Sequence, residues 1–164
     1  MDIIVKIIFI FLALILGILI ANIVDAKRVK HAMSFREALD LTDLPIITFK
    51  QGKERINLIL DTGSSKSVIT PDALEKLEYE KLEGSGTIMG MEGSLVETEY
   101  VDMEIYNNSN TYSEVFTVVD MSGAFAKLKE LHGVTVHGIL GNSFFTKYDF
   151  IIDYNKLIAY GKRG

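Results

Sequence analysis

The chain has 164 residues, enough for one modest domain and an accessory segment. It contains no cysteine, which excludes disulfides, thiolate metal sites and a cysteine nucleophile. From residue 41 onward, 12 Lys and Arg residues stand against 18 Asp and Glu residues, a net charge of −6. An acidic domain argues against a nucleic-acid partner, because phosphate binding needs a positive field.

The N-terminal part of the chain is apolar over residues 7–24, with a single polar side chain. Together with residues 3–5, this run is long enough to cross about 30 Å of hydrocarbon as a helix, and Lys6 can reach the interface. The sequence therefore predicts a transmembrane anchor at residues 3–24, with the lipid bilayer as a partner. The alternative is a cleaved signal peptide, which would make the protein secreted or periplasmic, because residues 24–26 loosely resemble a small-x-small cleavage site.

The charges that flank this segment indicate an orientation. Four basic residues lie within residues 27–36, whereas Lys6 and the amino terminus precede the apolar run. Counting Lys and Arg near the ends predicts a single-pass membrane protein with the domain that follows the anchor on the cytoplasmic side. Residues 25–43 are then a juxtamembrane linker, in which the Ser-x-x-Glu pattern of residues 34–37 indicates a capping box and a short helix.

From residue 44 onward, short runs of β-forming residues alternate with turn residues, a pattern typical of a barrel or a sandwich. Strands are predicted at residues 45–49, 55–60, 95–106, 114–119, 134–141, 149–153 and 156–160. Short helices are predicted at residues 71–77, 122–131 and 142–148, and a glycine-rich hairpin at residues 86–94. The sequence thus predicts a mainly β domain at residues 44–161.

One stretch within this domain, residues 58–70, reads LILDTGSSKSVIT and places an acid directly after a buried strand. An isolated buried carboxylate costs several kcal/mol, so Asp61 needs a charged or hydrogen-bonding partner. Gly63 permits a sharp turn, and the neighbouring hydroxyls can hold a carboxylate. Two such loops that face each other and share a proton would account for all of these residues. The alternative is an ordinary turn aspartate after an edge strand.

This stretch resembles the active-site loop of the aspartic proteases, in which two hydrophobic residues precede Asp-Thr-Gly-Ser/Ala. Residues 136–142, VHGILGN, are similar to the apolar-apolar-Gly element of that family, and residues 140–162 resemble its closing segment. The order of the motifs, with a glycine-rich hairpin between them, is also the family's. The resemblance covers residues 44–161 and points to the single-domain, retroviral-type (retropepsin-like) members. It implies a closed β-barrel formed by a single lobe.

The resemblance also implies roles for the residues of the loop. Asp61 would be the catalytic acid, and Thr62 would make the hydrogen bonds that join two active-site loops. Gly63 would leave its backbone open to the substrate, and Ser64 could donate a hydrogen bond to the carboxylate. The implied substrate is a peptide, and no cofactor or metal is implied.

Two further groups of residues take their roles from the same resemblance. Three residues at the tip of the glycine-rich hairpin would form a flap over the bound peptide: Met89, Gly90 and Met91. Three residues would pack behind the active-site loop: Ile139, Leu140 and Gly141.

The chain carries a single Asp-Thr-Gly, whereas two-lobed members of the family carry two. A single copy implies a homodimer to which each subunit contributes its Asp61 across a two-fold axis. The predicted function is therefore that of a membrane-anchored aspartic endopeptidase, in which two carboxylates activate a water molecule. The alternative is a catalytically silent, membrane-tethered dimer of the same fold that binds an extended peptide by strand addition.

Overall fold

The computed structural model of the chain describes residues 10–17, 31–89 and 95–161. Within these ranges the strands are β1 (Ile46–Gln51), β2 (Glu54–Leu60), β3 (Ser67–Ile69), β4 (Glu80–Met89), β5 (Leu95–Asn107), β6 (Asn110–Val118), β7 (Gly138–Leu140), β8 (Phe150–Asp153) and β9 (Ile158–Gly161). The labelled helices are α2 (Phe35–Thr42), α3 (Pro71–Leu74), α4 (Ser122–His132) and α5 (Asn142–Tyr148). The domain is mainly β, as the sequence predicts.

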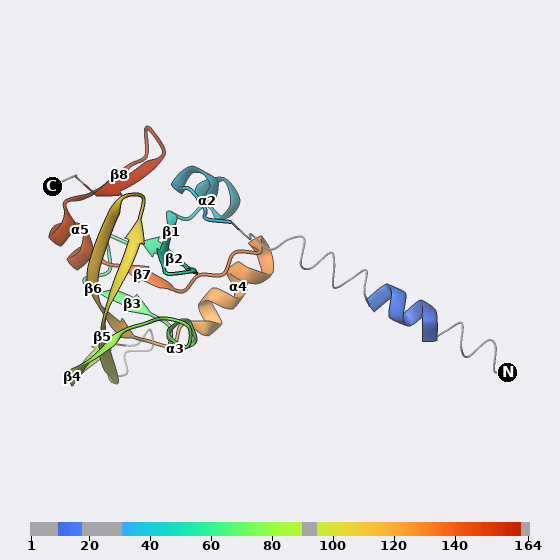
Figure 1. The fold of residues 1–164 in the computed structure, drawn as a ribbon, viewed down its shortest axis with the longest axis horizontal. Coiled ribbons are helices and arrows are strands. Elements are labelled where there is room, and N and C mark those ends of the chain that lie inside the picture. The colour runs from blue at the N-terminus through green and yellow to red at the C-terminus, as the bar shows by residue number, and fades with distance from the viewer. Residues whose placement is uncertain (1–9, 18–30, 90–94, 162–164) are drawn as a thin grey trace, which may run out of the picture.

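Six of the strands form a closed ring in the order β1, β2, β7, β3, β6 and β5 (Figure 1). The ring closes where β1 meets β5, with Lys50 opposite Tyr106. Strand β4 pairs with β5 outside the ring, and the β4–β5 hairpin extends beyond the rest of the barrel (Figure 1). Closure removes exposed strand edges from most of the sheet.

Strand β7 lies between β2 and β3, the two strands that the Asp61 loop connects. It runs parallel to β2, with Leu60 opposite Leu140, and antiparallel to β3, with Val68 opposite Ile139. The connection from β2 to β3 is therefore the segment that leaves the sheet on one side of β7 and returns on the other. This segment, residues 61–66, contains the Asp-Thr-Gly motif.

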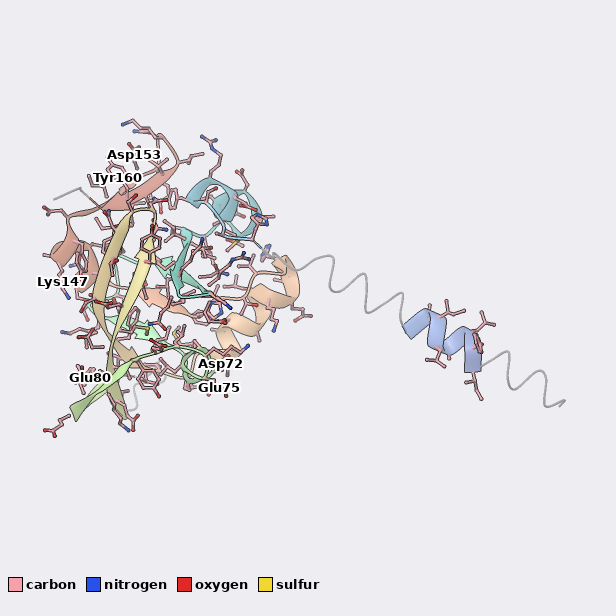
Figure 2. The ribbon with its side chains drawn as sticks, in the orientation of Figure 1. Asp72, Glu75, Glu80, Lys147, Asp153 and Tyr160 are labelled. Carbon is pink, nitrogen blue, oxygen red and sulfur yellow. The ribbon has the colours of Figure 1, made fainter. Side chains whose placement is uncertain are left out.

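The core of the barrel is rich in aromatic side chains. Phe49, Phe116 and Phe144 are fully buried, and the rings of Phe49 and Phe144 meet edge to face with their centroids 5.9 Å apart. Strand β5 contributes Val101, Met103 and Ile105 to this core at alternating positions, as its sequence predicts. The β8–β9 hairpin, which carries Asp153 and Tyr160, forms a separate two-stranded sheet beside the barrel (Figure 2).

Helix α2 begins with the capping interaction that the sequence predicts, because the Ser34 hydroxyl accepts a hydrogen bond from the Glu37 backbone N–H at 3.2 Å. The helix packs against the domain, with Phe35 and Ala38 buried. The Met33 backbone N–H donates to the Thr48 hydroxyl on β1 at 2.8 Å. Part of the segment expected to act as a linker therefore contributes to the core.

The predicted membrane anchor and single-pass localisation are wrong on the evidence of the described helices. Over the described residues, no helix combines the length and the apolar character that crossing a membrane requires. Residues 10–17 are helical, and the rest of the predicted anchor, residues 3–9 and 18–24, lies outside the described residues.

Several element boundaries also differ from those predicted. Strand β3 lies within the hydroxyl-rich stretch that was expected to be loop, and β4 begins at Glu80, before the predicted hairpin. Helix α3 ends at Leu74 rather than at residue 77, and Thr70 does not cap it through its side chain. The Thr70 hydroxyl instead donates to the His137 carbonyl at 3.2 Å, so a tertiary hydrogen bond replaces the local one.

Candidate active site

Asp61 lies at the carboxyl end of β2, immediately after the buried Leu60. Its backbone N–H donates to the Leu140 carbonyl on β7 at 3.0 Å, which continues the β2–β7 ladder into the loop. The side chain is half-buried, and its Oδ1 accepts a hydrogen bond from the Gly63 backbone N–H at 2.8 Å. The strand and the turn together hold the carboxylate at the surface in a defined direction.

The residues after Asp61 make a tight turn. A Cβ atom at Gly63 would lie 3.1 Å from Asp61 Oδ1, so a side chain there would crowd the carboxylate. Thr62 and Gly63 are exposed at the tip of the loop. The Ser64 hydroxyl, which was expected to donate to the carboxylate, donates to the Lys66 carbonyl at 2.7 Å instead. Ser64 therefore stabilises the turn rather than the charge on Asp61.

The loop rests on the segment that follows β7. A Cβ atom at Gly141 would lie 2.3 Å from the Lys66 carbonyl oxygen, so only glycine allows the two backbones to approach this closely. The Asn142 N–H donates to the Ser64 carbonyl at 2.7 Å, and the Ser143 N–H donates to the Ser65 carbonyl at 3.3 Å. The structure thus places Gly141 directly behind the Asp61 loop.

The other two residues expected behind the loop lie on β7. Leu140 is fully buried and pairs with Leu60, while Ile139 is half-buried and pairs with both Ile59 and Val68. All three residues of the Ile-Leu-Gly element are therefore in contact with the strands or the loop that position Asp61.

Of the three predicted flap residues, the structure describes Met89. Met89 is the last residue of β4, and its backbone pairs with Leu95. Gly90 and Met91 fall outside the described residues. Lower in the hairpin, a Cβ atom at Gly86 would lie 1.8 Å from the Tyr100 hydroxyl oxygen, so the tyrosine packs directly on the glycine backbone.

A buried carboxyl that is not among the predicted site residues lies beneath the loop. Glu114 on β6 is 3% exposed, and its Oε1 accepts hydrogen bonds from the Ser67 hydroxyl at 2.7 Å and the Ser143 hydroxyl at 3.2 Å. Burial raises the pKa of Glu114, and these hydrogen bonds and the charge of Lys147 oppose that rise. The sequence contained a signal for it, because Glu114 alternates with Tyr112 on one face of the β6 strand.

A half-buried imidazole lies at the opposite end of β7. The Nδ1 atom of His137 accepts a hydrogen bond from the Asn57 backbone N–H at 3.0 Å, and the His137 N–H donates to the Asn57 carbonyl at 2.9 Å. Burial lowers the pKa of His137, and the charge of Asp72 opposes that fall. His137 is thus part of the backbone ladder rather than a surface residue.

Comparison with known proteins agrees with this arrangement. A family model described as aspartyl protease matches residues 47–144, which is more than half of the chain. No curated protein gives a significant match. The matched segment contains the Asp61 loop, the β4–β5 hairpin, Glu114 and the β7 element.

Two solved structures are similar to the chain. The retroviral protease-like domain of Ddi1 from Leishmania major aligns with a TM-score of 0.52 and 11% identity, over 74% of this chain and 90% of that one. The EIAV protease, solved with an inhibitor, aligns with a TM-score of 0.46 and 24% identity, over 63% of this chain and 86% of that one. The predicted retropepsin-like fold is confirmed, and the chain belongs to the aspartyl protease family.

Proposed function

We propose that the protein is an aspartic endopeptidase whose active site forms between two copies of the chain, each contributing Asp61. The catalytic unit would be residues 44–161, with α2 packed against it. The observation that carries the proposal is the placement of the Asp61 carboxylate, held by the Gly63 N–H at the end of β2 in a fold of the aspartyl protease family.

The exposed loop tip supports a dimeric site. Thr62 and Gly63 are accessible in one copy of the chain, and the chain supplies a single Asp-Thr-Gly. In the proposed dimer, the two loops face each other across a two-fold axis and Thr62 contributes hydrogen bonds between them. The β4–β5 hairpin of each copy would cover an extended peptide, with Met89, Gly90 and Met91 near its tip.

The chemistry of such a site is general acid–base catalysis. Two carboxyl groups about 3 Å apart do not readily ionise together, so the pair holds one proton, a behaviour for which the aspartic proteases are the standard example. The ionised carboxylate takes a proton from a bound water as its oxygen attacks the scissile carbonyl carbon. The protonated carboxyl donates to the carbonyl oxygen. The carbon–nitrogen bond then breaks as the amine nitrogen is protonated.

The proposal predicts that the purified full-length protein cleaves members of a diverse peptide library and that Asp61→Asn abolishes the cleavage. Asp40→Asn is the matched control, because it makes the same chemical change on an exposed site of α2. We expect the control to retain full activity and a pepstatin-type inhibitor to block the wild type. A wild type that cleaves no peptide from acidic to neutral pH, or an equally active Asp61→Asn variant, contradicts the proposal.

The dimeric site has a separate test. Wild type and Asp61→Asn are mixed in equal amounts and allowed to exchange subunits. If both Asp61 residues are required, random pairing leaves about a quarter of all dimers with two wild-type subunits, so the activity is about a quarter of that of wild type at the same total protein concentration. A single-chain active site would instead leave about half. If the wild type forms a dimer that binds peptides without cleaving them, the chain is a peptide-binding module of the same fold.

A further inference from the structure

Glu114 lies beneath the Asp61 loop, where a carboxyl group is costly. Carboxyls are rarely fully buried without partners, and Glu114 is 3% exposed on β6. It is not among the residues expected to touch the substrate. Its contacts instead lead to the two segments that surround Asp61.

The hydrogen bonds around Glu114 have a fixed direction. A carboxyl oxygen accepts, so the hydroxyl hydrogens of Ser67 and Ser143 both point toward Oε1. Because its hydrogen is committed to Glu114, Ser67 Oγ presents a lone pair to the Gly141 backbone N–H at 3.2 Å. Glu114 thereby fixes the orientation of a hydroxyl that links β3 to the segment after β7.

These contacts surround the base of the active-site loop. Ser67 is the first residue of β3, directly after Lys66, whose carbonyl rests on Gly141. Gly141 in turn follows Leu140, whose carbonyl accepts the Asp61 N–H. The Glu114 cluster, defined here as Glu114, Ser67 and Ser143, therefore connects both ends of the loop to the same point on β6.

We propose that Glu114 is a positioning residue: it orients the Ser67 and Ser143 hydroxyls so that the Asp61 loop stays fixed against residues 140–143. The effect of Glu114 on catalysis rests on the proposed endopeptidase function, whereas its effect on the position of the Asp61 loop does not. Without the carboxyl oxygen, Ser67 is free to rotate its hydroxyl and the Gly141 N–H loses a defined acceptor. The loop and Asp61 then lose their fixed direction.

The charged groups that face Glu114 come from two neighbouring elements, Lys147 on α5 and Asp102 on β5 (Figure 2 labels Lys147). Lys147 Nζ donates to the Ser113 carbonyl, which holds α5 next to β6. The role assigned to Glu114 depends on its acceptor oxygen rather than on its charge. Glutamine keeps an acceptor oxygen in a side chain of the same length, whereas leucine fills the space without one.

The test compares Glu114→Leu with Glu114→Gln in the full-length protein. We expect Glu114→Leu to lower kcat by about 100-fold, the size expected for a displaced catalytic group, with a much smaller change in KM. Amide hydrogen exchange at Gly141 and Asn142 should accelerate by about tenfold. Glu114→Gln should keep kcat and the exchange rates within a few-fold of the wild type.

Thr48→Val is the matched control. Thr48 is also a buried hydroxyl that bridges two segments, since it accepts the Met33 N–H and donates to Asn57, but it lies away from the loop. Thr48→Val should reduce stability without changing kcat or the exchange of Gly141 and Asn142. Ser67→Ala provides a second disruption, because it removes the same link while Glu114 remains, and it should lower kcat as Glu114→Leu does.

The positioning role is overturned if Glu114→Leu and Ser67→Ala behave like Thr48→Val, with lower stability but wild-type kcat and exchange at Gly141 and Asn142. It is also overturned if Glu114→Gln loses as much activity as Glu114→Leu, because charge would then matter rather than the acceptor. If the wild type cleaves no peptide, the proposed function fails by itself. The exchange rates of the variants then decide the positioning role independently.

Discussion

At the Gly141 end of β7, backbone lies directly against backbone, with the loop of Asp61 on top and the Glu114 cluster below. At the His137 end, side chains fill the same structural role, since an imidazole nitrogen accepts the Asn57 N–H and the Thr70 hydroxyl donates to the His137 carbonyl. Both ends join β7 to its neighbours. Glycine permits a close backbone contact at each end, since a Cβ atom at Gly138 would lie 2.1 Å from the Val68 carbonyl oxygen. The His137 end depends in addition on the protonation state of a side chain.

The two ends should therefore respond to different perturbations. A change of volume at Gly141 affects the Asp61 loop, because the Lys66 carbonyl of that loop lies against the glycine. A change of pH affects the His137 end, because protonation at Nδ1 removes the acceptor of the Asn57 N–H. Glu114 lies at the Gly141 end but carries a titratable group. The stability of that end should therefore also depend on pH.

The largest expected effect is that of Gly141→Ala. The new Cβ would lie 2.3 Å from the Lys66 carbonyl oxygen and 2.4 Å from its carbonyl carbon, both backbone atoms of the loop. We expect the free energy of unfolding to fall by about 3 kcal/mol or more and peptide cleavage to be lost. Denaturant unfolding and the peptide-library assay measure the two effects.

Gly123→Ala is the control for this substitution. Gly123 lies in α4, and a Cβ there meets no atom within 4 Å. We expect the free energy of unfolding to rise by about 0.5–1 kcal/mol, because alanine favours a helix more than glycine does. Equal losses of stability at the two positions would show that the close contact at Gly141 is not what makes glycine necessary.

The His137 end is tested by His137→Phe, which keeps an aromatic ring but removes the acceptor. At neutral pH we expect the free energy of unfolding to fall by about 1–3 kcal/mol, because the Asn57 N–H is left without a partner. The pKa of His137 is lowered by folding, so its stabilising contribution is complete above about pH 6.5 and decreases as the pH falls through the folded-state pKa. The difference between wild type and variant should therefore narrow toward pH 5. A difference that does not depend on pH would contradict this account.

The smallest expected effect concerns the charge of Glu114. Its pKa is raised by folding, so its contribution to stability is complete below about pH 4.3 and is lost as the pH rises through the folded-state pKa. Relative to Glu114→Gln, the wild type should therefore lose unfolding free energy between acidic and neutral pH. Denaturant titrations of both proteins at several pH values measure the difference. A wild type that gains stability over the variant with rising pH would mean that the site favours the carboxylate.

Local sequence patterns predicted most of the elements. The alternation of Val101, Met103 and Ile105 identified the inner face of β5, and Gly133 ends α4 in the left-handed conformation expected at a C-terminal cap. The Asp-Thr-Gly and Ile-Leu-Gly motifs predicted the two segments that meet at Asp61. The two motifs lie far apart in the sequence, but each can be recognised from its own residues.

What the sequence did not predict depends on tertiary contacts. Ser67 reads as part of a polar loop, yet it begins β3, because pairing with β6 and β7 overrides its local preference. Glu114 reads as a solvated acid until the strand face that it shares with Tyr112 is recognised as buried. For the N-terminal run, composition alone predicts a membrane span, whereas over the described residues no helix is long and apolar enough to cross a membrane. The homodimer and the site roles stay predictions.

Helix α2 limits where the chain can be cut without damage to the barrel. Met33 and Phe35 are each 3% exposed, and Ala38 is fully buried, so these side chains complete the core from outside the strands. Proteolysis after residue 43 would remove all three and expose the apolar surface that they cover, at a cost comparable to that of truncating large core residues. Cleavage before residue 31 would leave the same surface covered. Removal of the N-terminal segment from an intact, folded domain therefore requires a cut upstream of Met33.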